Sequence, residues 1–309
     1  MKKVNRILII TIALISFLLN EVSAQQEAMY SQYMFNTMAV NPAYAGSREV
    51  FSLTGLYRAQ WLGIDGAPVS QTISMDAPLA NKKVGLGLII FNDKIGYTSN
   101  TGAHASYSYR IRFRRNTLSF GLKLGIVQYY ADLTQATLPT GNTTDDVGFA
   151  KNITIYIPSA GAGIYLNSDK YYIGASIPNM YNTKLVKNTS IKVNKYDHVF
   201  LMGGYVIDLK NEMKLKPSFL YKFVMGAPME LDLNTNLWFY DVLGLGISYR
   251  TGDAIIGMFE LQVQNNLRIG YSYDYTTSKL SNYNSGTHEL IMRYEFGFGK
   301  SKVVTPRYF

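Results

Sequence analysis

The sequence predicts an all-β fold, an antiparallel transmembrane β-barrel of the outer membrane with about 14 strands. Three observations support this class. Apolar and polar residues alternate with a period of two over segments of about ten residues. The connections between these segments fall into a short and a long class. The N-terminus also carries the pattern of an export signal.

Period-two alternation is clear between residues 118 and 126, where large apolar residues hold the even positions and Gly, Ser or Lys the odd positions up to 125. The segments 243–250 and 267–276 repeat this pattern. A soluble β-sandwich also alternates, but segments of about ten residues have the length that a tilted membrane strand needs. Aromatic clusters such as 238–240 mark expected membrane interfaces. If the Gly- and Ser-rich face is watery, Gly125 should tolerate serine.

Fourteen candidate strands follow from the alternation and the turn residues. An even number of strands would return both chain ends to the same side of the membrane, the periplasm. The expected strands cover 49–59, 69–77, 83–92, 99–113, 116–131, 156–167, 170–177, 196–208, 213–223, 229–239, 241–250, 254–264, 267–276 and 286–298.

The connections alternate between two classes along the chain. Those after odd-numbered strands include long loops at 132–155, 178–195 and 277–285. Outer-membrane barrels have short periplasmic turns and longer external loops, so this sorting favours a barrel over a sandwich. The tight turns follow the even-numbered strands, at Asn81-Lys82, Arg114-Arg115, Asn167-Ser168-Asp169, Lys210-Asn211-Glu212, Tyr240-Asp241 and Asn265-Asn266.

The N-terminus predicts export. A basic start (Lys2, Lys3 and Arg6) precedes the apolar run Ile7–Leu19, which is too short for a comfortable bilayer span and fits a signal peptide. We expect cleavage after Ala24, and the absence of cysteine excludes a lipoprotein. Three regions follow: a signal peptide at 1–24, an N-terminal extension at 25–48 that forms a plug or periplasmic segment, and a barrel at 49–309. A helix over 28–37 would place Met29, Tyr33 and Asn36 on one face.

Composition argues against several functional classes. The formal net charge of +9 falls to +7 after the expected cleavage, but the basic residues are scattered and form no nucleic-acid motif. The three histidines, His104, His198 and His288, show no metal-ligand spacing, and no cofactor is expected. His104 and Ser106 would both face inward, but without a nucleophile-elbow motif. We therefore expect no enzyme.

Several short motifs carry a family resemblance. They are Ser31-Gln32-Tyr33-Met34-Phe35-Asn36, Asn41-Pro42-Ala43-Tyr44-Ala45-Gly46-Ser47-Arg48, Gln60-Trp61-Leu62-Gly63, Gly66-Ala67-Pro68, Gly85-Leu86-Gly87, Asp93-Lys94-Ile95-Gly96 and the closing Pro306-Arg307-Tyr308-Phe309. Together they resemble the PorP/SprF family of type IX secretion system membrane proteins of the Bacteroidota.

The resemblance implies an outer-membrane barrel of the secretion and gliding system that works without catalysis. It also implies one of two partners: a periplasmic peptidoglycan-associated protein, or a secreted surface adhesin with a C-terminal sorting domain that needs the barrel for export or anchoring. Outer-membrane lipid would surround the wall. The alternative function is a general nutrient porin or a hydrophobic-compound channel.

Candidate partner-binding residues come from two sources. Large aromatic side chains before the first strand are costly to leave in water, so Tyr33, Phe35 and Tyr44 should pack against the barrel interior or a partner. Trp61 is either an interface aromatic or a partner contact. Arg110, Arg112 and Arg250 face inward by alternation, where they would pair across the barrel or hold a carboxylate-bearing guest. The wide lumen would hold water, a plug or a peptide.

Overall fold

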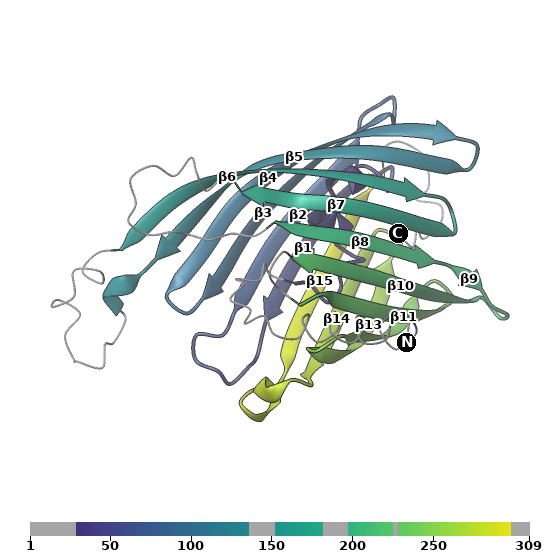
Figure 1. The fold of residues 1–309 in the computed structure, drawn as a ribbon. Coiled ribbons are helices and arrows are strands. Elements are labelled where there is room, and N and C mark those ends of the chain that lie inside the picture. The colour runs from purple at the N-terminus through teal and green to yellow at the C-terminus, as the bar shows by residue number, and fades with distance from the viewer. Residues whose placement is uncertain (1–28, 136–151, 182–196, 225–227, 298–309) are drawn as a thin grey trace, which may run out of the picture.

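A computed structural model describes residues 29–135, 152–181, 197–224 and 228–297. In this part of the chain the strands form one antiparallel sheet that closes on itself (Figure 1). β1 (Phe51–Ala59) pairs with β15 (Thr287–Phe296), and this pairing joins the first strand to the last. Closure leaves no free sheet edge at that seam, which a strand in hydrocarbon requires.

The described wall has fourteen strands, as predicted. β8 (His198–Tyr205) and β9 (Ile207–Asp208) are two pieces of one strand, because both pair with β10 in the same register on either side of Val206. The others are β2 (Val69–Pro78), β3 (Val84–Ile95), β4 (Thr98–Phe113), β5 (Asn116–Ala131), β6 (Ile153–Asn167), β7 (Tyr171–Tyr181), β10 (Met213–Val224), β11 (Glu230–Phe239), β12 (Leu243–Arg250), β13 (Ala254–Gln264) and β14 (Leu267–Thr276).

The alternation of the sequence becomes the two faces of the wall. Leu122, Leu124 and Ile247 point outward and are 63%, 69% and 61% exposed, whereas neighbours such as Lys123 and Ser248 are buried inside. An apolar outer face with no other protein against it is what hydrocarbon requires. On β4 the outward residues stay apolar or aromatic from Phe113 to Ala103 and become polar at Thr101.

The two ends of the barrel differ. One end, which we call the short-turn end, carries all six predicted tight turns, and the left-handed residues Lys82, Arg114, Asn211 and Tyr240 lie in four of them. The opposite, long-loop end carries connections such as 60–68 and 277–286, although 96–97 and 251–253 are also tight there. The long loops expected at 132–155 and 178–195 lie largely outside the described residues.

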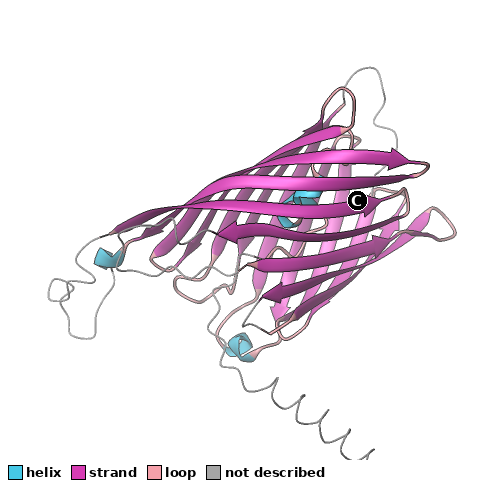
Figure 2. Ribbon diagram, turned by 45° about the horizontal axis from the view of Figure 1, so that its top comes forward, coloured by secondary structure: helices cyan, strands magenta, loops and turns pink. Residues whose placement is uncertain are grey.

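Residues 29–48 of the N-terminal extension lie inside the barrel (Figure 2). It contains the helix α2 (Thr37–Val40) and the 3-10 helix η1 (Pro42–Tyr44), while residues 31–35 form turns. Residues 29–36 therefore do not form the short helix that would place Met29, Tyr33 and Asn36 on one face. α2 ends just before Asn41, because a residue that precedes proline is disfavoured in the helical region.

Two further 3-10 helices, η2 (Leu133–Gln135) and η5 (Lys279–Asn282), lie beyond strand ends. Among the residues described here, no helix has both the length and the apolar character to cross a membrane.

Candidate functional site

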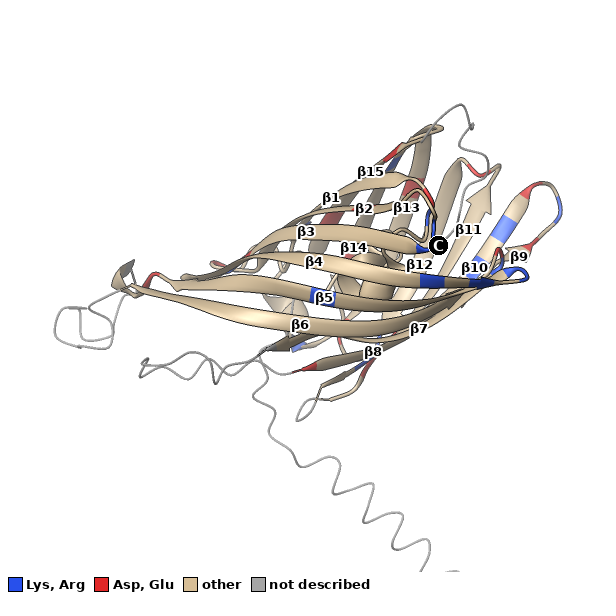
Figure 3. Ribbon diagram, turned by 90° about the horizontal axis from the view of Figure 1, so that it is seen from above, with Lys and Arg blue, Asp and Glu red and all other residues tan. Residues whose placement is uncertain are grey.

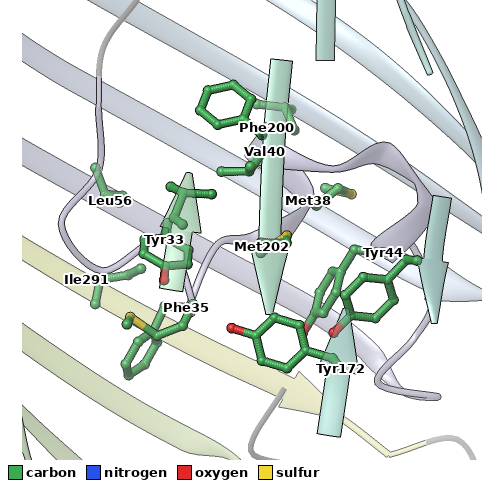
Figure 4. Packing of buried hydrophobic residues seen from close by; sticks show 14 of the residues in the cluster. Tyr33, Phe35, Met38, Val40, Tyr44, Leu56, Tyr172, Phe200, Met202 and Ile291 are labelled. Carbon is green, nitrogen blue, oxygen red and sulfur yellow. The ribbon is translucent and has the colours of Figure 1, made fainter. Parts of the chain in front are cut away.

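The lumen is filled by residues 29–48, which we call the plug segment. Tyr33, Phe35 and Tyr44 are 1%, 3% and 2% exposed, and Met38 is equally enclosed. They pack against wall residues of several strands (Figure 4). Burying each large side chain of this kind stabilises a protein by about 1.5–3 kcal/mol, so the segment is part of the folded barrel.

Glycines of the wall make room for the plug backbone. A Cβ atom added at Gly85 would overlap the carbonyl oxygen of Ala45, and one at Gly121 would overlap the backbone nitrogen of Ala43. One at Gly163 would overlap the side-chain oxygen of Asn41. These glycines lie on β3, β5 and β6, so part of the inner wall is shaped to the stretch 41–45.

Side chains of the plug and the wall also satisfy each other's backbone groups. Asn41 Nδ2 donates to the carbonyl of Ile164 at 3.0 Å. Ser108 Oγ donates to the carbonyl of Ala45 at 2.6 Å, and Ser176 Oγ donates to that of Val40 at 2.8 Å. Buried polar groups without such partners would be costly, so these bonds favour one position of the segment.

The start of the plug segment is tied to buried charges. The backbone N–H groups of Ser31 and Gln32 donate to the two carboxylate oxygens of Glu289, at 2.9 and 2.8 Å. Arg58 pairs with the same Glu289 at 3.1 Å and with Asp274 at 2.8 Å. Its charge is therefore held by two wall carboxylates rather than left for a guest.

The other end of the plug segment is held by a second set of charges. Gly46 N–H donates to Asp76 Oδ2 at 2.8 Å, and Arg48 forms an ion pair with Glu295.

The Phe35 ring lies within cation–π range of the guanidinium groups of Arg293, 5.2 Å away, and Arg268, 5.8 Å away.

The structure brings five of the seven candidate residues into the lumen. Tyr33, Phe35 and Tyr44 belong to the plug, and Arg110 and Arg250 are buried in the wall. The Arg110 guanidinium lies 3.5 Å from the carbonyl oxygen of Ser47 and 3.7 Å from the Glu49 carboxylate.

The two remaining candidates lie at the barrel ends. Arg112 is 44% exposed and pairs with Glu49, because β4 runs past the enclosed part of the lumen at the short-turn end (Figure 3). It has the same parity on β4 as the inward Arg110 and pairs with the same Glu49, but it lies outside the enclosed part of the lumen. Trp61 is half-buried at the long-loop end, where its backbone N–H donates to Thr287 Oγ1 at 3.0 Å.

Sequence reasoning placed Asp274 and Glu289 inward but missed Asp232, the buried acidic partner of Arg250. Arg250 Nη2 lies 3.0 Å from Asp232 Oδ2, and both side chains are 1% exposed. The alternation of 230–239 places Asp232 inward, which was the available signal. The wall glycines opposite the plug had no comparable signal, because their role depends on which part of the chain faces them.

His104 and Ser106 are both buried in the lumen, and His104 contacts a serine of another strand. Its Nε2 lies 3.2 Å from Ser159 Oγ of β6, in the buried lumen. A serine–histidine pair is not by itself a catalytic site, since nucleophilic catalysis also needs a group that orients the histidine. No group of three or more His, Asp or Glu in the described chain would hold a metal ion.

The sequence matches one protein family over most of its length. The model of the type IX secretion system membrane protein PorP/SprF family matches residues 22–294, nearly the whole chain. The chain belongs to the PorP/SprF family. It is a β-barrel of the outer membrane in type IX secretion.

Among solved structures, the chain is similar to the Ralstonia pickettii toluene transporter TbuX, with 9% identity over 86% of this chain and 93% of that one and a TM-score of 0.49. A Pseudomonas aeruginosa FadL homologue has 12% identity, 84% and 94% coverage and a TM-score of 0.47. Acinetobacter baumannii Omp33 has 11% identity, 80% and 98% coverage and a TM-score of 0.46. No curated protein matches the chain.

Proposed function

We propose that this PorP/SprF barrel is a non-catalytic partner-binding component of type IX secretion whose lumen is closed by its own plug segment. The partner would be a secreted surface adhesin with a C-terminal sorting domain, which the barrel helps to export or anchor, or a periplasmic peptidoglycan-associated protein. Membership of the family supports a role in secretion. The observation that carries the proposal is the fit between the plug and the wall.

A general porin needs a continuous watery path. Here the middle of the lumen holds an apolar cluster contributed jointly by plug residues such as Met38 and wall residues such as Leu56, Met202 and Ile291. Moving those plug side chains away from the wall would expose apolar surface of both the plug and the wall to water. The free-energy cost is about 25 cal/mol per Å² exposed. The same segment carries motifs that resemble the family, which supports a role in function as well as in stability.

The first test separates a partner barrel from a porin. The purified protein in a planar bilayer should show no steady ion conductance. Stable open-channel currents from the unaltered chain would contradict the proposal.

The second test concerns the partner. Affinity purification from native outer membranes, followed by mass spectrometry, should recover one of the two partner classes in stoichiometric amount. Deletion of residues 31–48 should abolish that recovery and the surface display of the cargo. The deletion also removes part of the core, so Gly121→Val is the companion variant. Its larger side chain should push the plug backbone away from β5 while the chain keeps its full length. Unchanged partner recovery and display in both variants would remove the plug from the mechanism.

A further inference from the structure

A cavity of about 810 Å³ opens at the long-loop end, above the plug. We call it the vestibule. Met29, Tyr30 and Ala39 of the plug lie along it, together with residues of β3 to β5, of β11 and β12, and of the turn 251–253. Its volume lies in the range of about 300–1,000 Å³ that is typical of ligand sites. The contacts that hold the plug in the lumen do not use this space.

The vestibule has large apolar side chains among its outermost lining residues. Ile95 and Leu280 are 50% and 39% exposed, at the end of β3 and in η5, and Trp61 lies beside the same cavity. Large apolar side chains that cluster at a cavity and remain exposed to solvent usually mark a binding site. They suit the apolar side chains of a guest.

One side of the vestibule carries a chain of ion pairs with an excess of acids. Glu230, Arg250 and Asp253 line the cavity and belong to this network. Its pairs are Lys222–Glu230 (3.7 Å), Arg250–Glu230 (3.5 Å), Arg250–Asp232 (3.0 Å), Arg250–Asp253 (3.3 Å), Arg250–Asp274 (3.9 Å), Arg58–Asp274 (2.8 Å) and Arg58–Glu289 (3.1 Å).

Three bases thus face five acids, a formal excess of two negative charges among the residues that the structure describes. The imbalance has an atomic counterpart. At the vestibule itself, Glu230 Oε1 is enclosed and accepts no hydrogen bond within the described chain, and its nearest cation, Arg250 Nε, lies 3.5 Å away. Buried carboxylates gain most from a further charge-assisted donor, so this side of the vestibule favours a cation.

The opposite side has the reverse balance. On β3 and β5, Lys94 and Lys123 line the vestibule with one acid, Asp93. A basic group on a guest would therefore be directed to the Glu230 and Asp253 side. This reverses the expectation that inward arginines such as Arg250 hold an acidic guest, because Arg250 is already surrounded by carboxylates.

We propose that the vestibule binds a polypeptide segment in which a lysine or arginine lies next to large apolar side chains. The basic group pairs with Glu230 and Asp253, and the apolar side chains pack against Ile95 and Leu280. This inference rests on the proposed function, since it names the chemistry of the partner segment.

The test uses a phage-displayed random heptapeptide library, panned on the full-length protein in lipid nanodiscs. Recovered peptides should be enriched in Lys or Arg adjacent to aromatic or aliphatic residues. The best peptide should lose about tenfold in affinity for the Glu230→Gln/Asp253→Asn variant, since one charge-assisted bond is worth about 1.4 kcal/mol or more. Leu280→Ser should weaken binding while the preference for a basic residue persists.

Asp93→Asn is the matched control, an acid removed from the other side of the same cavity. It should change the affinity by less than about twofold, and heat-modified mobility on gels should show that every variant is folded. Enrichment of acidic or uncharged peptides, an equal loss in the Asp93→Asn control, or no recovered peptide would overturn the inference. Failure of the proposed function itself would show separately, as ion conductance by the unaltered barrel.

Discussion

The two faces of strand β5 place different demands on their residues. Outward, Phe120, Leu122 and Leu124 meet only lipid, and any large apolar side chain would meet that need. Inward, Gly121 has no room for one methyl group, because the backbone of the plug lies against it. The residues of the outer face thus need only be apolar, as in any membrane barrel, whereas the residues of the inner face fit one particular segment of this chain. Four sets of substitutions test this difference.

The largest effect is expected inside. Arg58→Met would leave the buried Asp274 and Glu289 without their shared cation, and the loss of one partner of a buried ion pair costs about 3–5 kcal/mol. Urea unfolding of the lipid-reconstituted barrel measures this change. A loss below about 1 kcal/mol would mean that the plug anchor is not held by these charges.

Next comes a charge on the outer face. Leu122→Arg places a cation in hydrocarbon, at a cost of about 2–4 kcal/mol near the bilayer midplane. The variant should assemble poorly, as measured by heat-modified mobility of outer-membrane fractions. Normal assembly would show that Leu122 does not face lipid. The matched control is Leu122→Ile, which should assemble as the unaltered chain does.

A single methyl group should separate the two faces most clearly. Gly121→Ala forces the wall against Ala43, and overpacking of this kind costs about 1–3 kcal/mol. Gly257→Ala adds the same methyl group on the outer face, where nothing lies within 4 Å, and should change the stability by less than about 0.5 kcal/mol. Equal effects of the two variants would abolish the distinction between the faces.

The smallest effect is expected from one hydroxyl group of the plug. Tyr33→Phe removes the hydrogen bond that Asn234 Nδ2 donates to the tyrosine oxygen at 2.8 Å, worth about 1 kcal/mol. The unfolding midpoint should fall slightly while partner recovery persists. An increase in stability would indicate that the hydroxyl is poorly accommodated.

The same contrast explains what the sequence predicts well. The expected strands 254–264 and 267–276 match β13 and β14, because alternation and turn residues are local properties of the chain. β6 begins at Ile153, three residues before its predicted start. The tight turns were also predictable, since their residues adopt positive φ or precede strands with clear alternation.

The inner surface was predictable only in part. Aromatic content before the first strand predicts that Tyr33 and Phe35 are buried, but not where. Gly125 was expected to tolerate serine, yet a Cβ atom there would overlap the ring of His104. Such contacts join residues that are far apart in the sequence, so period-two patterns carry no information about them.

An engineered disulfide can show whether the plug segment occupies the lumen. The chain contains no cysteine, so Ala45→Cys with Ser108→Cys introduces one defined pair. Ser108 Oγ lies 2.6 Å from the carbonyl oxygen of Ala45, and the two residues are 63 apart in sequence. Mild oxidation of outer membranes, followed by mass spectrometry of proteolytic peptides, should recover the cross-linked pair in most molecules. Ala45→Cys with Ser218→Cys, on a different strand, should not cross-link. Free thiols in the first pair, in a barrel that is otherwise folded, would contradict a plugged lumen.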